Sequence, residues 1–349
     1  MAEMTDRPVT ISDVAERARV SVATVSRVLS GGSASAAARK KVEEAVLALG
    51  YRPQTGKKTE ARPESLALVL TDLTNPYYAA LAAGAEQAAR EAGYPLIVYR
   101  PETARFAEGM AERILSLPAA GAVLVGTAVE TGSPEEIRGR LCQISQRMPI
   151  VTIGPKVDGV DCVNITSDLS LSVRKSIAHL VALGHRRISF IGGSGGIRSS
   201  SARRPAYYEE MERLGLPADR ELHTDTGFTP QTGEFCVNRL LSGALAEERP
   251  TAIIAINDLV ALGALRQLQR MGLRVPEDMA LIGCDNQFFT PFLNPPLTTV
   301  DLHPFDHGYS AVEELISCLR SGSRSYSQIR ECSLIVRESC GALLGTRGG

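Results

Sequence analysis

The sequence predicts an α/β protein in which a small helical head precedes a two-lobed core. Residues 10–53 carry three short helical patterns, whereas β-rich and helical runs alternate from Ser65 onward. The alternating runs form two series, which indicates two parallel sheets, each flanked by helices. The length of 349 residues fits two or three domains.

We divide the chain into a head, a linker and a core. The linker sequence QTGKKTEARPE has no apolar periodicity and separates two regions that do. The head covers residues 1–53, the linker 54–64 and the core 65–349. Lobe one of the core is assigned to about 65–165 and 290–322, and lobe two to about 166–289 and 323–340.

The composition argues against several classes of protein. Apolar residues make up 44% and charged residues 22%, as in a globular chain, and no apolar run reaches the ~18 residues of a membrane span. The N-terminus lacks the apolar stretch of a secretory signal, so we expect a cytoplasmic protein. The seven scattered cysteines include no CxxC and the five histidines no HExxH, so we expect reduced thiols, no metal and no cofactor. The absence of Trp disfavours a single-strand binder that stacks bases.

The charge is divided unevenly along the chain. Residues 1–62 contain 11 Lys and Arg against 7 Asp and Glu, a net charge of +4, and the remainder contains 27 against 32, a net charge of −5. A basic head on an acidic body favours contact between the head and a polyanion. The alternative is a terminal domain whose charges are only solvated, and the modest excess leaves that alternative open.

The first two helical patterns of the head form a helix-turn-helix motif. The run ISDVAERA (11–18) has apolar residues at helical spacing, with Thr10 or Ser12 as its N-cap. A second helix begins at Ser21 after a tight turn, and a third covers about 35–50. In such a motif the second helix enters the major groove of DNA.

The second helix carries side chains suited to that groove. Ser21 and Thr24 can donate hydrogen bonds to phosphates, which positions the helix. Arg27 can form two hydrogen bonds with a guanine, and Val22 and Ala23 can contact thymine methyl groups. The alternative is an ordinary three-helix bundle with a capping serine and a solvated arginine. Three helices in about 40 residues make a poor core by themselves, which favours DNA binding.

These motifs resemble those of the LacI/GalR family of bacterial regulators. The stretch 10–53, ending in GYRP, resembles the DNA-binding head of that family. The core matches the family's landmarks in order and spacing at TNPYYAALAAGAEQAAREAGY (74–94), HLVALGHRRISFIGG (179–193), PTAIIAINDLVALGAL (250–265), VPEDMALIGCDN (275–286) and PPLTTVDLHP (295–304). The resemblance implies a periplasmic-binding-protein-like core and a homodimer that binds double-stranded operator DNA. It also implies a small effector that changes the spacing of the two heads.

With this resemblance, the residues expected to contact DNA are Thr10, Ser21, Val22, Ala23, Thr24, Arg27, Tyr51, Lys57 and Lys58. Three positions depart from the family's pattern. Arg19 stands where the turn usually carries Gly, which is strained if the turn needs a positive φ. The linker is short and has no Leu before Leu66, which argues against an apolar wedge in the minor groove. In lobe two the usual Asp-Asn pair is Asp168-Leu169.

Polar residues follow the ends of several predicted strands and define an expected effector cleft. Ligands of parallel sheets bind beyond the carboxyl ends of the strands, and two lobes that face each other there would form a cleft. Carboxylates, amides, one arginine and an aromatic face suit a hydroxyl-rich or anionic small molecule. The candidates are Asp72, Asn75, Tyr77 and Tyr78 from lobe one, and Arg203, Phe228, Asn257, Asp258 and Asp285 from lobe two.

Several lobe-two candidates also have a purely structural interpretation. Asn257 or Asp258 stands where a helix begins and would then only cap it. Phe228 would belong to the core, and Arg203 would form a salt bridge within its lobe. The resemblance favours effector contact for Arg203, Phe228 and Asp285.

A hydrolase is the alternative from another functional class. The run GGSGG satisfies G-x-S-x-G with Ser194 as the nucleophile, and Asp258 or Asp285 and then His303 follow in the expected order. That motif needs a helix directly after the serine, whereas IRSSSARRP with Pro205 predicts an extended loop. We therefore expect no catalytic residue and a Gly-rich loop beside the cleft.

The sequence thus predicts a transcriptional regulator, and more specifically a repressor, that is not an enzyme. We expect it in the bacterial cytoplasm, and at the nucleoid when it is bound to DNA. We expect a homodimer through lobe one, chiefly through the Ala-rich helix near residues 77–93. Family analogy suggests a sugar or sugar derivative as the effector.

Overall fold

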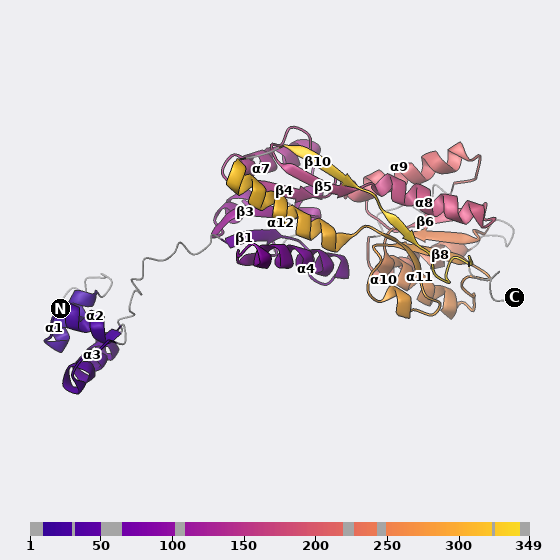
Figure 1. The fold of residues 1–349 in the computed structure, drawn as a ribbon. Coiled ribbons are helices and arrows are strands. Elements are labelled where there is room, and N and C mark those ends of the chain that lie inside the picture. Colours follow the sequence, from indigo (N-terminus) through magenta and orange to yellow (C-terminus); the bar gives the residue numbers. More distant parts are fainter. Residues whose placement is uncertain are drawn as a thin grey trace, which may run out of the picture. The chain divides into compact units, whose positions relative to one another are not determined.

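A computed structural model describes the head and most of the core. The described residues are 10–29, 32–49, 65–101, 109–218, 227–242, 249–322 and 325–342. The chain divides into two compact units, residues 1–62 and 63–349, of which the first contains the head and the second the core (Figure 1). The predicted fold class, a helical head with a parallel-sheet α/β core, is confirmed.

The head is built from three helices around a small aliphatic core. They are α1 (Ile11–Ala18), α2 (Val22–Leu29) and α3 (Ala36–Leu49). Each helix contributes one fully buried valine, namely Val14, Val25 and Val42. The predicted linker, residues 54–64, lies outside the described residues, so the predictions about its length and its missing wedge remain predictions.

The turn between α1 and α2 runs through a left-handed residue. Arg19 has a φ of 53° and a ψ of 46°, and its N–H closes α1 by donating to the carbonyls of Ala15 and Glu16. A residue with a Cβ atom costs roughly 1–2 kcal/mol in this conformation. The positive φ that would make Arg19 strained is therefore present.

Lobe one is a six-stranded parallel sheet between two layers of helices. Its strand order is β10-β5-β4-β3-β1-β2. The strands are β1 (Ser65–Val69), β2 (Leu96–Tyr99), β3 (Ala119–Val125), β4 (Ile150–Ile153), β5 (Val163–Ser167) and β10 (Tyr326–Arg330). The helices are α4 (Pro76–Glu91) and α12 (Pro304–Ser321) on one face, α5 (Met110–Leu115) and α7 (Pro134–Ser145) on the other, and the short α6 (Thr127–Glu130) after β3.

Lobe two is a five-stranded sheet in the order β11-β9-β8-β7-β6, parallel except for the antiparallel edge strand β11. The strands are β6 (Ile188–Ile191), β7 (Ala252–Ala255), β8 (Ala280–Cys284), β9 (Thr298–Asp301) and β11 (Ser333–Ile335). The helices are α8 (Leu169–Ala182), α9 (Arg198–Arg213), α10 (Pro230–Leu241) and α11 (Asp258–Arg270), with the 3-10 turn η1 (Thr290–Phe292). Helices α8 and α9 lie on the opposite side of the sheet from α10 and α11 (Figure 1).

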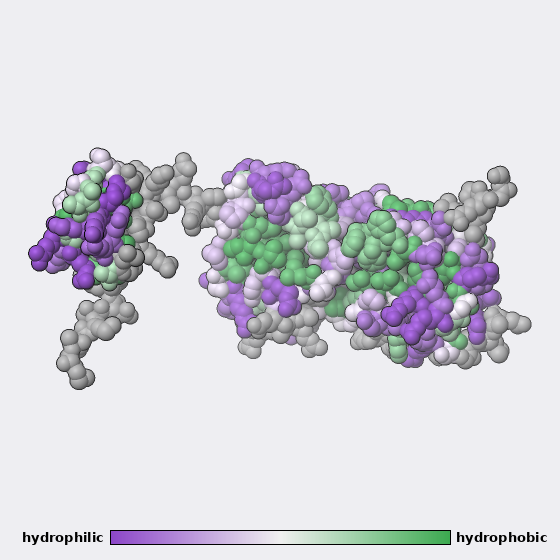
Figure 2. Space-filling view, turned by 90° about the horizontal axis from the view of Figure 1, so that it is seen from below, coloured by the Kyte–Doolittle hydropathy of each residue, from purple (hydrophilic) through white to green (hydrophobic). Residues whose placement is uncertain are grey.

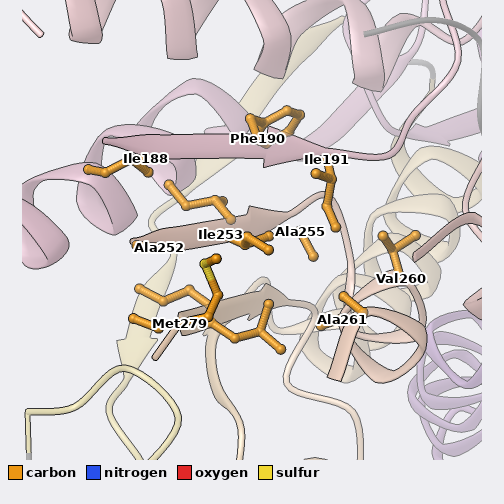
Figure 3. Close-up of a cluster of buried hydrophobic side chains, with 14 of the residues drawn as sticks. Ile188, Phe190, Ile191, Ala252, Ile253, Ala255, Val260, Ala261 and Met279 are labelled. Atoms are coloured by element: carbon orange, nitrogen blue, oxygen red, sulfur yellow. The ribbon is translucent and has the colours of Figure 1, made fainter. Parts of the chain in front are cut away.

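The apolar runs of lobe two form strands such as β6 and β7 because both faces of the sheet are covered. Every residue of β6 and β7 is buried. Figure 3 shows their side chains beside Met279 and beside Val260 and Ala261 of α11. Strands that are covered on both faces are apolar without alternation, which is why the sequence pattern identified them.

The predicted lobe boundaries are wrong at two places near the C-terminus. Strand β9, assigned to lobe one, pairs in parallel with β8 of lobe two. Strand β10, assigned to lobe two, pairs in parallel with β5 of lobe one over five residues. The chain therefore passes from one sheet to the other three times, after β5, between β9 and α12, and between β10 and β11.

The extended loop predicted after Ser194 is also wrong. Residues 198–213 form helix α9, with Pro205 inside it. The helix continues past the proline because its next turns are anchored in the core. Tyr207 is fully buried, and its hydroxyl donates to the carbonyl of Ile188 at 2.8 Å. Burial and tertiary hydrogen bonding outweigh the cost of an interior proline here, which is ~3 kcal/mol.

Two glycines allow α4 and α12 of lobe one to cross in backbone contact. A Cβ atom at Gly84 would overlap the carbonyl of Phe305, and one at Gly308 would overlap the carbonyl of Leu81. The small residues of α4 therefore serve a contact within the lobe. They leave only the opposite side of this helix for the dimer contact that the sequence assigned to residues 77–93.

Candidate DNA-binding and effector-binding sites

The outer face of α2 carries the predicted DNA-contacting side chains. Ser21, Val22, Ala23 and Arg27 are exposed, and the exposed fraction of Val22 is 44%. The inner face of the same helix is anchored by the buried Val25 and Val28. On this exposed face, Val22 suits contact with thymine methyl groups and Arg27 suits contact with base edges.

The two hydroxyls at the start of α2 bond to each other and keep one free donor. Ser21 Oγ accepts the Thr24 N–H at 3.2 Å, and the two hydroxyl oxygens are 2.8 Å apart. Only one of the two hydroxyl hydrogens can lie between these oxygens, so the other remains available for a phosphate. The pair therefore caps the helix and can still position it on DNA.

Thr10, by contrast, is committed to the start of α1. Its hydroxyl donates to Asp13 Oδ2 at 2.7 Å and accepts the Asp13 N–H at 3.4 Å, which forms a capping box. Its hydroxyl hydrogen is thus already used within the helix. The remaining predicted DNA contacts, Tyr51, Lys57 and Lys58, lie outside the described residues.

A cavity of about 100 Å³ that opens to solvent lies between the two lobes of the core. Polar and aromatic side chains from both lobes line it, as in small-molecule sites. Seven of the nine predicted effector residues line it, namely Asn75, Tyr77, Tyr78, Arg203, Phe228, Asn257 and Asp285. The prediction that residues after strand ends of both lobes converge on one cleft agrees with this geometry.

The other two predicted effector residues do not line this cavity and have local structural roles. Asp72 accepts the backbone and side-chain hydrogens of Thr74, which forms a tight turn before α4. Asp258 is fully buried, and its two carboxylate oxygens accept the Gln287 N–H at 2.7 Å and the Thr299 hydroxyl at 2.6 Å. Asp258 thereby fixes the loop that follows β8.

Asn257 combines the capping role with a place in the cavity wall. Its Oδ1 accepts the Val260 N–H at 2.9 Å, which caps α11. Its Nδ2 donates to the carbonyl of Phe228 at 3.1 Å and so holds the loop that carries this ring. The helix cap and the aromatic face are positioned by a single side chain.

Arg203 supplies the positive charge of the cavity. It is 8% exposed, and its Nη1 donates to the carbonyl of Ile256 at 2.5 Å. Its buried Nε has no hydrogen-bond partner among the described residues. A buried guanidinium with an unused donor favours a ligand acceptor over a salt bridge within the lobe.

Asp285 faces Arg203 from the end of β8. Its φ of 111° is strained for a non-glycine residue, and its N–H donates to the carbonyl of Val300 at 2.7 Å. Burial raises the pKa of Asp285 to about 7, although the charge of Arg203 and a hydrogen bond from Gln287 oppose the shift. Burial and the adjacent Asp285 also raise the pKa of Asp258. The cavity therefore holds a carboxyl group that titrates near neutrality.

Several cavity residues were missed from the sequence, and among them Glu130 joins the two lobes. Its carboxylate, on α6 of lobe one, accepts the Ser199 N–H of α9 at 3.1 Å. Arg198 of α9 also joins the lobes, because it donates to the carbonyls of Pro155 and Lys156 after β4 of lobe one. No motif signals Glu130 in the sequence, because its partner lies 69 positions away. The other missed polar residues include Thr166, Ser167, Ser199 and His307.

The hydrolase constellation is not assembled. Helix α9 begins four residues after Ser194, and the Ser194 N–H donates to Ser200 Oγ at 3.1 Å. His303 lies instead against Asp301 and Ser333.

Among the described residues no group of His, Cys, Asp and Glu could hold a metal ion, and all seven thiols are free. In that same part of the chain no helix is long and apolar enough to span a membrane.

A head with an exposed groove-sized helix and a core with a polar inter-lobe cavity define a DNA-binding regulatory protein. Residues 10–54 match the bacterial regulatory proteins of the lacI family, and residues 177–340 match the periplasmic binding protein-like domain. The repressor PurR of Haemophilus influenzae (strain PittEE) is 30% identical over 96% of this chain and 99% of its own length. The chain belongs to the LacI family, as the sequence motifs indicated.

Other relatives and solved structures agree over nearly the full length. The repressor CytR of Escherichia coli (strain K12) is 29% identical over 98% of this chain and 99% of its own. The CelR–cellobiose complex has a TM-score of 0.68 and 28% identity over 95% of this chain and all of that one. The structure of the lac repressor dimer bound to operator and the anti-inducer ONPF matches with a TM-score of 0.71 and 23% identity. The match covers 96% of this chain and 99% of that chain, which supports the fold. The prediction of a transcriptional regulator is confirmed, and these relatives lend the hydrolase alternative no support.

The raised pKa of Asp285 predicts a pH-dependent cost to folding. Because the folded carboxyl keeps its proton up to about pH 7 and the unfolded one releases it near pH 4, stability falls as pH rises between these values. Asp285→Asn removes this ionisation. We expect the loss of unfolding free energy between pH 4.5 and pH 8 to shrink by on the order of 2–4 kcal/mol in the variant, measured by urea denaturation without ligand.

Asp278→Asn is the matched control. Its carboxylate is held by Arg274, which lowers its pKa to about 2, so the variant should gain no stability at pH 8. If Asp285→Asn and the parent lose the same free energy between pH 4.5 and pH 8, the carboxyl of Asp285 is ionised throughout and our assignment is wrong.

Proposed function

We propose that this protein is a homodimeric repressor that releases or retains operator DNA in response to a small, hydroxyl-rich or anionic metabolite. The observation that carries the proposal is the pairing of an exposed recognition-type face on α2 with a cavity that presents Arg203, Asp285 and Phe228. This assignment involves no enzymatic step. An operator-binding protein acts where the chromosome is, in the bacterial cytoplasm.

In the DNA complex, α2 would lie in the major groove of each half-site. Ser21 and Thr24 would bond phosphates, Arg27 would bond a guanine, and Val22 and Ala23 would contact methyl groups. Lys57, Lys58 and Tyr51 would add contacts from the linker side of the head. Thr10 would act through the start of α1, because its hydroxyl hydrogen is used in the capping box.

A sugar or sugar derivative is the effector class that the cavity supports best. Phe228 is half-buried on the loop before α10, where the apolar face of a sugar ring could lie on it. Arg203 and Asp285 would bond hydroxyls or an acidic group. The relative CelR is described in complex with cellobiose, which fits this class.

In addition to the outer side of α4, the second copy would dock on an adjoining apolar surface that spans both lobes. Leu73 of lobe one is 54% exposed, and Phe288 and Phe292 of lobe two are 75% and 83% exposed. The two regions adjoin, because Gln287 Nε2 lies 3.4 Å from Asn75 Oδ1. Figure 2 shows apolar surface on both lobes of the core in the view from below. Large exposed aromatic groups of this kind mark protein interfaces.

Arg27→Ala should weaken operator binding by about 1–3 kcal/mol and relax specificity at one base pair per half-site. The operator is first selected from random duplexes with the full-length protein, and affinities are then measured on all single-base variants. Arg17→Ala, an exposed arginine in the last turn of α1, is the control and should keep the specificity profile. A uniform loss on every sequence by Arg27→Ala would assign this side chain to phosphate.

Arg203→Ala should abolish the effector response and leave operator affinity without effector unchanged, since the head is a separate unit. A panel of free and phosphorylated sugars is screened for a change in operator affinity of the parent protein. Arg174→Ala, which removes an exposed ion pair with Glu209 on the same lobe, should keep the response. Unchanged ligand affinity in Arg203→Ala would make Arg203 a structural residue.

Replacing both Phe288 and Phe292 with Asp should produce a monomer at micromolar concentration in sedimentation velocity. Two desolvated charges cannot be accommodated at an apolar dimer interface. Ile329→Asp is the control. Ile329 is 68% exposed on β10, at one edge of the lobe-one sheet, whereas Leu73 of the proposed dimer surface follows β1, next to the other edge. A double variant that remains dimeric would show that the surface is misplaced.

A further inference from the structure

His307 is a buried cavity residue whose role neither the sequence motifs nor the rest of the site explains. It lies in the first turns of α12, directly after the crossing from β9 of lobe two to lobe one. It is 1% exposed and belongs to the wall of the inter-lobe cavity. Its ring nitrogen Nε2 lies 3.3 Å from the hydroxyl oxygen of Ser167, at the end of β5.

The hydrogen bonds of Ser167 determine the tautomer of His307. The Ser167 hydroxyl donates to the carbonyl of Leu302 at 3.1 Å. A carbonyl oxygen can only accept, so the single hydroxyl hydrogen of Ser167 is committed to Leu302. Ser167 Oγ must therefore accept from His307, which places the imidazole hydrogen on Nε2. In the neutral ring Nδ1 is then a bare acceptor.

That acceptor is buried and unsatisfied in the described part of the chain. His307 Nδ1 is almost inaccessible and has no hydrogen-bond partner there. Protonation does not provide an alternative, because burial and the nearby Arg330 and His303 lower the pKa of His307 to about 4, against a smaller opposing effect of Asp301. A buried acceptor without a donor costs free energy until something supplies one.

We propose that His307 Nδ1 accepts a hydrogen bond from a hydroxyl or N–H group of the effector, and so selects for a ligand with a donor at the lobe-one wall. The inference rests on the proposed effector role of the cavity. It also orients the ligand, because an acidic group would be repelled by the lone pair of His307 and attracted by the unused Nε–H of Arg203. We therefore expect the ligand to place a hydrogen-bond donor toward α12 and hydrogen-bond acceptors toward α9.

The first test determines the tautomer in the full-length protein without ligand. Long-range ¹⁵N–¹H correlation spectra of ¹⁵N-histidine protein report which ring nitrogen carries the hydrogen, and His307→Leu assigns the signals. We expect the Nε2–H form of His307 at pH 7. We expect Ser167→Ala, which keeps the ring and removes its acceptor, to lose this preference. An Nδ1–H tautomer in the parent protein would overturn the proposal.

The second test measures the hydrogen bond with sugar probes by titration calorimetry. The probes are D-ribose, D-glucose and cellobiose, and, for any that binds, its set of single deoxy and O-methyl analogues. Removal of one particular hydroxyl from the sugar should weaken its binding to the parent protein by about tenfold. The same removal should leave binding to the His307→Leu variant unchanged. His179→Leu, a histidine on α8 that pairs with Cys340, is the control and should behave as the parent protein does.

The outcomes separate this inference from the proposed function. If a probe binds but every deoxy analogue loses the same factor in the parent and in His307→Leu, the role of His307 is overturned and the effector site stands. If none of the probes binds the parent protein, the sugar-like effector is overturned together with its contact to His307. Should His307→Leu fail to fold, Ser167→Ala replaces it, with the same hydroxyl expected to lose its effect.

Discussion

The backbone contact between α4 and α12 is the constraint on which the lobe-one half of the proposed effector site depends. Gly84 and Gly308 let the two helices cross with no side chain between them, and Figure 1 shows the helices side by side. The N-terminal ends of both helices lie at the cavity, where α4 brings Tyr77 and Tyr78 and α12 brings His307. A methyl group at either glycine would separate these two walls, because it would overlap backbone atoms that cannot move independently.

The polar groups of the cavity include both a donor and an acceptor that a ligand could satisfy. Arg203 and His307 both retain a buried hydrogen-bonding atom without a partner in the described residues, one a donor and the other an acceptor. Asp285 shifts its pKa to about 7 because burial outweighs the attraction of Arg203. Each of these features costs free energy, and a ligand that carries both donors and acceptors would relieve it. That combination in one cavity supports the proposed effector site.

The parts of the candidate site that depend on local chain order could be predicted from the sequence. Strand ends and helix starts are readable, so Asn75, Asn257 and Asp285 could be placed at the cleft. The parts of the fold that a distant contact determines could not be predicted from the sequence. Strand β10 belongs to lobe one because of its pairing with β5, and no local pattern encodes that pairing. Pro205 predicts a loop by local rules, whereas the buried Tyr207 keeps the chain helical. No local motif marks His307, because its chemistry depends on Ser167, 140 positions away.

The start of α9 links the cavity to the contact between the two lobes. The residue before this helix, Ile197, has no side chain that could cap it. The carboxylate of Glu130 takes that role from the opposite lobe by accepting the Ser199 N–H. Opening the cleft would therefore remove the cap of the helix that carries Arg203, at a cost typical of lost caps, ~1 kcal/mol. A ligand shifts the lobes only by binding one arrangement better than the other. Arg203 and Asp285 lie on lobe two and His307 on lobe one. A ligand that bonds all three would therefore favour the arrangement of the lobes in which Glu130 caps α9.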